Sequence, residues 1–151
     1  MDLSRNPAFF ELLAGSYRRM VGAEPPFLVS GEPHSAEWLY DRAPWCVVAH
    51  NMAPDPRFIY ANRAAQRLFG YSFAEFTALP SRLSAGPADR AERQRLLDSV
   101  AAQGYATGYS GLRIAKSGRR FWIKDGVIWQ LVDEAGVARG QAATFGNWRD
   151  A

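Results

Sequence analysis

Apolar and polar positions divide the chain into a helical beginning and a strand-rich end. In segment 7–21, apolar residues recur every three or four positions, the spacing of one buried helix face. Asn6 can cap the first turn, Pro7 suits the first helical position, and Gly22 with Pro25 ends the helix. We expect this helix to pack against the rest of the domain or against a second copy of the chain.

The middle of the chain predicts two short strands and several short helices. Apolar runs at 45–49 and 58–61 indicate the strands, with a turn between them. Ser35, Asn62 and Ser72 are residue types that cap helix N-termini. Segment 79–87 is expected to be irregular. Helices are expected at 36–43, 63–69 and 73–76, and from Pro87 and Asp89 to Gln103.

The last third of the chain predicts a three-stranded meander. Strand-like runs cover 105–115, 120–132 and 138–148, and glycine-containing turns separate them. The order of elements indicates an α+β fold, with a five-stranded antiparallel sheet and short helices on one face. We expect residues 1–34 to form an N-terminal helical extension and residues 35–151 to form the domain proper.

Composition narrows the class of protein. The chain of 151 residues suits one domain, and its single cysteine, Cys46, leaves no partner for an intrachain disulfide. No apolar run approaches the length of a membrane span, so we expect a cytoplasmic protein. The net charge is +3, but no basic run exceeds two residues, which argues against nucleic-acid binding.

Arginines mark one face of the expected long helix. Arg90 and Arg93 share a stripe with Leu97 and Val100, the apolar positions of that helix. In one interpretation their stems cover the edge of the core while the charged groups reach water. In the other, they converge with Arg82 near the helix N-terminus and bind a carboxylate or phosphate. The sequence favours neither.

The segment 121–131 alternates, and its odd positions are the more apolar set. Strict alternation places Asp125 in the interior, where a carboxylate needs a partner. A three-residue turn before this strand would point Arg113 inward to pair with Asp125, whereas a four-residue turn would put it outside. The pair would be structural or form the polar end of a ligand cavity. The cavity walls are expected from Tyr109, Val127 and Trp129.

Catalytic and metal-binding signatures are missing from the sequence. It contains no GxSxG, GxGxxG or P-loop motif, so no catalytic residue is assigned. His34 and His50 are the only histidines, and neither has an acidic cluster beside it, which argues against a metal site. We therefore expect a binding protein and not an enzyme.

Two motifs carry a resemblance to known families. "YANRAAQRLFGYS" and "VDEAGVARGQAATF" resemble the strand-to-helix segment and the last hairpin of the PAS superfamily. Together with "AEWLYDRAPW", "LPSRLS", "DRAERQRLL" and "GYSGLRIAKSGRRFW", they are more similar to the MEKHLA domain, a PAS-like family. The similarity covers roughly residues 36–145. It implies a PAS-like domain that binds a small molecule and signals.

"PSRLSAGPADRAERQRLL" is also similar to the light-oxygen-voltage (LOV) branch of the superfamily, which binds flavin. The resemblance puts Arg82 at the phosphate-binding arginine and Arg93, or Arg95, near its helical partner. Ser81 stands where the photoreactive cysteine is expected, so an adduct would require Cys46 to lie against the ligand. Arg113 and Ile123 replace two amide side chains around the flavin ring. Flavin binding without an adduct stays open, whereas the missing histidine on the long helix argues against haem.

The sequence therefore supports three alternative functions. The first is a sensor or regulatory module for an anionic, partly aromatic ligand, which signals through a homodimer or a partner protein. Its ligand residues would be Arg82, Arg90, Arg93, Tyr109, Arg113, Asp125, Val127 and Trp129. The second is a protein–protein interaction module with a filled core, and the third is a flavin-binding PAS protein without adduct chemistry.

Overall fold

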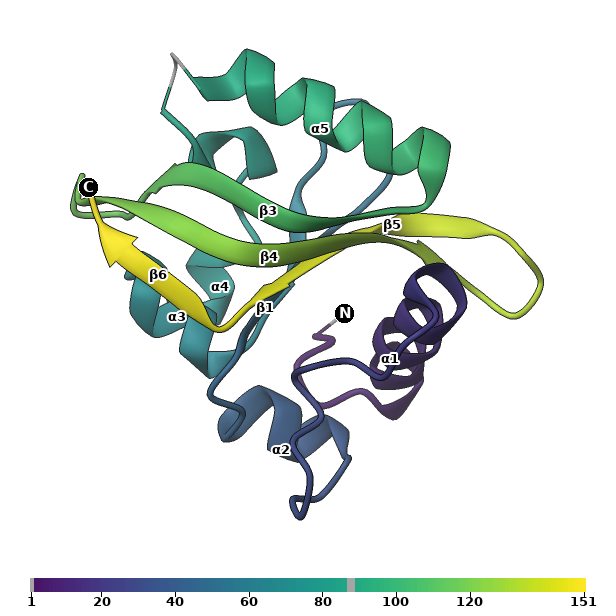
Figure 1. Ribbon diagram of the computed structural model, residues 1–151. Coiled ribbons are helices and arrows are strands. Elements are labelled where there is room, and N and C mark those ends of the chain that lie inside the picture. Colours follow the sequence, from purple (N-terminus) through teal and green to yellow (C-terminus); the bar gives the residue numbers. More distant parts are fainter. Residues whose placement is uncertain (1, 87–88) are drawn as a thin grey trace.

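Among the residues that the structure describes, the sheet has six antiparallel strands, because the last predicted strand divides in two at Gly146 (Figure 1). A computed structural model describes residues 2–86 and 89–151. The spatial order is β2-β1-β5-β4-β3, and β6 pairs with β4 beyond the end of β5. The strands are β1 (Cys46–His50), β2 (Phe58–Ala61), β3 (Tyr105–Ile114), β4 (Arg120–Val132), β5 (Ala138–Phe145) and β6 (Asn147–Asp150). The predicted α+β class and the antiparallel sheet are confirmed.

The helices begin where the sequence places their caps. The side chains of Asn6, Ser35, Asn62 and Ser72 each accept a hydrogen bond from a backbone N–H of the first helical turn. Asp89 holds the N-cap position of α5 without a side-chain capping bond, and Pro87 lies outside the described residues. The helices are α1 (Pro7–Val21), α2 (Ala36–Asp41), α3 (Arg63–Phe69), α4 (Phe73–Phe76) and α5 (Arg90–Gln103), with a 3-10 turn at Ser81–Ser84.

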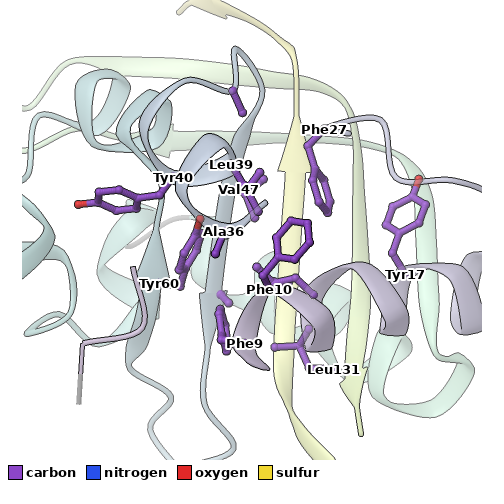
Figure 2. Close-up of a cluster of buried hydrophobic side chains, with 14 of the residues drawn as sticks. Phe9, Phe10, Tyr17, Phe27, Ala36, Leu39, Tyr40, Val47, Tyr60 and Leu131 are labelled. Atoms are coloured by element: carbon purple, nitrogen blue, oxygen red, sulfur yellow. The ribbon is translucent and has the colours of Figure 1, made fainter. Parts of the chain in front are cut away.

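The helices cover both faces of the sheet. α1 packs against β4 on one face and α5 packs against β3 on the other, so the two long helices lie on opposite sides (Figure 1). On the α1 side, aromatic residues of α1 and of the following connector gather over the strands (Figure 2). On the α5 side, a second apolar cluster joins the sheet to α3 and α4. Of the two predicted packing modes, α1 therefore adopts the one within its own domain.

The alternation of β4 reverses at Asp125. Its φ of 52° lies in the left-handed region, and the pairing of β4 with β3 shifts by one residue between Ile123 and Gly126. This is a β-bulge, which adds one residue to a strand and exchanges its two faces. Ile123 therefore faces the α5 side, whereas Trp129 faces the α1 side.

Three predicted positions are wrong for this reason. Asp125 is exposed and not interior, so it forms no pair with Arg113. Val127 and Trp129 pack in the cluster under α1 and line no cavity with Tyr109. Strict alternation cannot anticipate a bulge, because the extra residue changes the face of every residue after it.

Arg113 points inward, as the three-residue turn predicts. The Ala115 N–H donates to the Arg119 carbonyl, which leaves three residues in the turn. With this turn, Arg113 pairs with Phe121 in the sheet. A second bulge on β3, between Ala106 and Tyr109, compensates the one on β4, so the original register returns at the pair Tyr105–Trp129. In the described part of the chain, no helix is long and apolar enough to cross a membrane.

Candidate functional site

A narrow cavity lies between α5 and the sheet. Its volume is about 50 Å³, counted as the space that the centre of a water molecule can occupy. On the same measure, one water needs roughly 10–15 Å³. The cavity can therefore hold a few waters or a small organic ion. Its apolar walls include Phe58, Phe69, Leu97, Ile123, Ile128 and Phe145.

Arg93 reaches the cavity from α5 and is buried, with 9% of its surface exposed. Its Nη2 donates a hydrogen bond to the Ser81 hydroxyl, 2.9 Å away. Burial lowers the pKa of the Arg93 guanidinium to about 10, so it remains a cation at neutral pH. The Ser81 hydroxyl therefore fixes the position of the Arg93 guanidinium.

Arg113 reaches the same cavity from β3 and is 8% exposed. Its Nη1 donates to the carbonyl of Leu112 at 2.7 Å, and its guanidinium lies 5.3 Å from the centre of the Tyr109 ring. The pKa of Arg113 is lowered to about 9, first by burial and second by the charge of Arg93, while the charges of Asp89 and Glu92 oppose the shift. No ion pair holds Arg93 or Arg113 among the described residues.

The Tyr109 ring packs directly over the backbone of two glycines, Gly111 and Gly126. A Cβ at Gly111 would come within 2.3 Å of the Tyr109 hydroxyl oxygen, and one at Gly126 within 3.1 Å of its ring. The ring therefore needs the absence of side chains at both positions. Its hydroxyl is buried and has no hydrogen-bond partner in the described residues. Since Tyr109 lines the cavity, this hydroxyl is a candidate donor to a ligand.

His50 and Gln141 form a second polar group in the cavity wall. They pair across β1 and β5, and both are more than nine-tenths buried. His50 Nδ1 lies 3.0 Å from the Asn51 carbonyl, and Gln141 Nε2 donates to the Leu97 carbonyl at 3.0 Å. His50 Nε2 and Gln141 Oε1 have no partner in the described residues. Neither residue was predicted as part of a site. The one signal for Gln141 in the sequence is a polar residue in the run before Phe145.

Two of the predicted arginines lie elsewhere. Arg82 is exposed, and its Nε forms an ion pair with Asp55 at 3.1 Å. Arg90 donates to the carbonyl of Ala85 at 3.2 Å. The three guanidiniums expected to converge at the start of α5 therefore contact three different partners, since Arg93 contacts Ser81. Of the eight predicted ligand residues, the structure brings Arg93, Tyr109 and Arg113 together at one cavity.

An outer groove adjoins the cavity on the side of α5 and β3. Arg93, Tyr109 and Arg113 line both spaces, so they form the wall between them. Asp89, Glu92 and the half-exposed Trp122 line the groove but not the cavity. Displacement of these three shared side chains would connect the cavity with the surface.

Cys46 does not belong to the cavity lining. It is buried on β1, and burial raises the pKa of its thiol to about 12. The neutral thiol is a poor nucleophile. A LOV-type adduct would require Cys46 to lie against the ligand, and Cys46 is not among the residues that line the cavity.

Comparison with known proteins identifies the family. The model of the MEKHLA domain matches residues 7–150, nearly the whole chain, α1 included. The chain belongs to the MEKHLA domain family. A comparison of this MEKHLA chain with curated proteins found no match.

Solved structures confirm the PAS-like fold of this MEKHLA domain. A PAS domain from Colwellia psychrerythraea has a TM-score of 0.61 and 21% identity, over 74% of this chain and 90% of that one. A light-oxygen-voltage domain described with a flavin analogue has a TM-score of 0.57 and 21% identity, over 70% and 76%. A blue-light activated histidine kinase from Erythrobacter litoralis has a TM-score of 0.59 and 20% identity, over 74% and 34%. These identities establish the shared fold alone.

Proposed function

We propose that this MEKHLA domain is a sensor or regulatory module that binds a small anion between Arg93 and Arg113. The observation that carries the proposal is two buried guanidiniums at one cavity without a carboxylate partner in the described residues. A buried cation without a counter-ion is costly, and an anionic ligand would remove that cost. The PAS-like fold supports a sensory role by analogy.

The donors around the cavity favour a carboxylate. Each guanidinium offers five N–H donors in a planar fork, yet each makes one hydrogen bond within the described part of the chain. A carboxylate can accept two parallel bonds from such a fork. The free hydroxyl of Tyr109 adds another donor beside Arg113. The apolar and aromatic walls then suit a short hydrocarbon or aromatic body.

We propose a binding module and not an enzyme because the cavity shows no activated nucleophile. The Ser84 hydroxyl lines the cavity, but it donates to the carbonyl of Ser81 at 2.8 Å. His50 contacts the Asn51 carbonyl. The two residues therefore lack the hydrogen bond through which a histidine activates a serine.

Signal transfer is proposed through movement of α5 against the sheet. A ligand held by Arg93 and Arg113 would bridge α5 to β3, which otherwise meet at the groove lined by Trp122. A change at this groove could alter contact with a second copy or a partner protein. We further propose that residues 1–34 act as an extension of the domain at 35–151, since α1 covers the face opposite α5.

The test uses native mass spectrometry and calorimetric titration with benzoate and propionate. The wild-type protein should bind an acid or carry a co-purifying anion. Arg93→Met and Arg113→Met should each weaken binding at least tenfold, roughly the loss of one charge-assisted hydrogen bond. Arg82→Met is the matched control and should bind normally, because Arg82 pairs with Asp55 at the surface. Unchanged affinity in both cavity variants would overturn the proposal.

The second candidate is an interaction module with a filled core, and the small size of the cavity favours it. No co-purifying mass and no acid binding would support this candidate. The small cavity volume also disfavours flavin, because binding sites for ligands of that size usually have volumes of about 300–1,000 Å³. A protein with flavin absorbance after purification would reverse that judgement.

A further inference from the structure

We propose that the ligand carries a hydrogen-bond donor, such as a hydroxyl group, in addition to its anionic group. This inference rests on the proposed function of the cavity and adds a second requirement to it. It comes from His50 and Gln141, two buried cavity residues that the anion does not involve.

The free atom of Gln141 is an acceptor. Its Nε2 donates to the Leu97 carbonyl at 3.0 Å and to Gln130 Oε1 at 3.2 Å. Both partners are oxygens that accept, so the amide nitrogen must face them and Oε1 must be the remaining atom. Gln141 Oε1 has no partner in the described residues. It can be satisfied only by a donor.

The free atom of His50 is also an acceptor. Its Nδ1 lies 3.0 Å from the carbonyl of Asn51, an atom that cannot donate, so Nδ1 carries the proton. Nε2 of the neutral ring then bears a lone pair, and it too is buried without a partner in the described residues. Burial lowers the pKa of His50 and so keeps the ring neutral. Two acceptors on residues paired across β1 and β5 therefore lack a donor in the described residues.

The cavity thus has complementary polar groups. Donors come from Arg93, Arg113 and Tyr109, whereas acceptors come from His50 and Gln141. Apolar side chains such as Leu97 and Ile128 line the remainder. A small hydroxy acid with an apolar body matches this distribution, because its carboxylate meets the donors and its hydroxyl can donate its single proton to one of the two acceptors. A bare carboxylic acid would leave both acceptors without a bond, which is costly in a buried site.

The experiment compares matched acids on the wild-type protein by calorimetric titration. The probes are 4-hydroxybenzoate against 4-fluorobenzoate, which is similar in size but has no donor, and 3-hydroxypropionate against propionate. The hydroxy acid of at least one pair should bind about three- to tenfold more tightly, the effect of one neutral hydrogen bond. His50→Phe should remove most of this preference. The matched control His34→Phe, at an exposed histidine, should retain it.

The outcomes separate the two proposals. Equal affinity within each pair, with both acids lost in Arg113→Met, would overturn the donor requirement and leave the anion site standing. Equal affinity in wild type, Arg93→Met and Arg113→Met would overturn the anion site itself. Failure of all four acids to bind would overturn the hydroxy-acid class and indicate that water satisfies these acceptors. The comparison of acids needs only the wild-type protein, so it remains decisive if His50→Phe fails to fold.

Discussion

Arg93 and Arg113 face one cavity from a helix and a strand, and the charge of each disfavours that of the other. Burial disfavours the charged form of the Arg113 guanidinium and lowers its pKa, and the positive charge of Arg93 acts in the same direction. The protein therefore bears an electrostatic cost at this point of its interior. Such a cost is expected at a binding site, where a ligand and not the fold supplies the counter-charge.

Replacing Arg113 with methionine should raise stability in the absence of ligand. In a buffer free of carboxylates and phosphate, Arg113→Met should increase the free energy of unfolding by about 1–4 kcal/mol, the range seen when buried charges become apolar. Urea unfolding measures the change. Arg82→Met, which removes an exposed ion pair, should cost no more than about 1 kcal/mol. A clear loss of stability in Arg113→Met would show that the guanidinium is structural.

Gly111 should be required for the position of Tyr109. A methyl group at 111 would lie 2.7 Å from the ring carbon Cζ, so the buried ring must move. Gly111→Ala should destabilise the fold by about 1–3 kcal/mol. Combination with Tyr109→Ala should cost less than the sum of the two single changes, because the clash disappears. Additive changes in urea unfolding would contradict this contact.

Ser16 should anchor α1 to the sheet. Its hydroxyl accepts from the Val132 N–H and donates to the Val132 carbonyl, both at 2.9 Å. Arg19 also donates to that carbonyl, so Ser16→Ala leaves mainly the N–H without a partner. The expected cost is about 1–3 kcal/mol of unfolding free energy, with faster hydrogen exchange in α1. Ser110→Ala, at an exposed position of β3, should change neither measurement.

Glu75 should titrate well below its ordinary range. The ion pair with Lys116, followed by the Ser72 N–H bond, lowers the pKa of Glu75 to about 2. Because the folded pKa lies below the unfolded value, its stabilising effect is complete above about pH 4.5 and declines as the pH falls toward 2. Titration by NMR should show a higher pKa for Glu75 in Lys116→Met. Lys124→Met, which changes the only other lysine, should leave it unaltered.

His50 should make stability depend on pH below neutrality. Burial lowers its pKa, Arg93 adds to this effect, and the bond to Asn51 opposes it. In the unfolded chain the His50 side chain takes up a proton at a higher pH than in the folded chain. The free energy of unfolding therefore falls as the pH drops below about 6.5. Urea unfolding at pH 7.5 and 5.5 should show a smaller loss in His50→Phe than in wild type. His34→Phe should lose as much as wild type.

Much of this fold could be predicted because its signals are local. The caps at Asn6 and Asn62 and the glycine stops at Gly22 and Gly70 act within one helical turn, and each helix begins and ends there. The turn before β4 is equally local, but the sequence left its length at three or four residues, and the structure has the three-residue form that points Arg113 inward. Cap chemistry involves neighbours in sequence, so it can be read without knowing the rest of the chain.

The candidate site could be predicted only in part. Periodicity placed Arg93 on the apolar stripe of α5, Tyr109 was expected in the cavity wall, and Arg113 faced inward for one of the two predicted turn lengths. The bulge at Asp125 broke the alternation on which the remaining positions depended. The participation of Gln141 depends on Leu97 and Gln130, which lie on other elements.

By itself, the sequence determined the elements, their order, the PAS-like class and the candidate arginines. The tertiary structure decided which arginines share a cavity, because a guanidinium 12 residues from Ser81 or 27 residues from Asp55 finds its partner only after the chain folds. It also decided that Asp125 lies outside, since a single left-handed residue exchanges the faces of a strand. Helix caps depend on bonds within a turn, whereas a binding cavity depends on contacts between distant segments, and only the folded chain contains these.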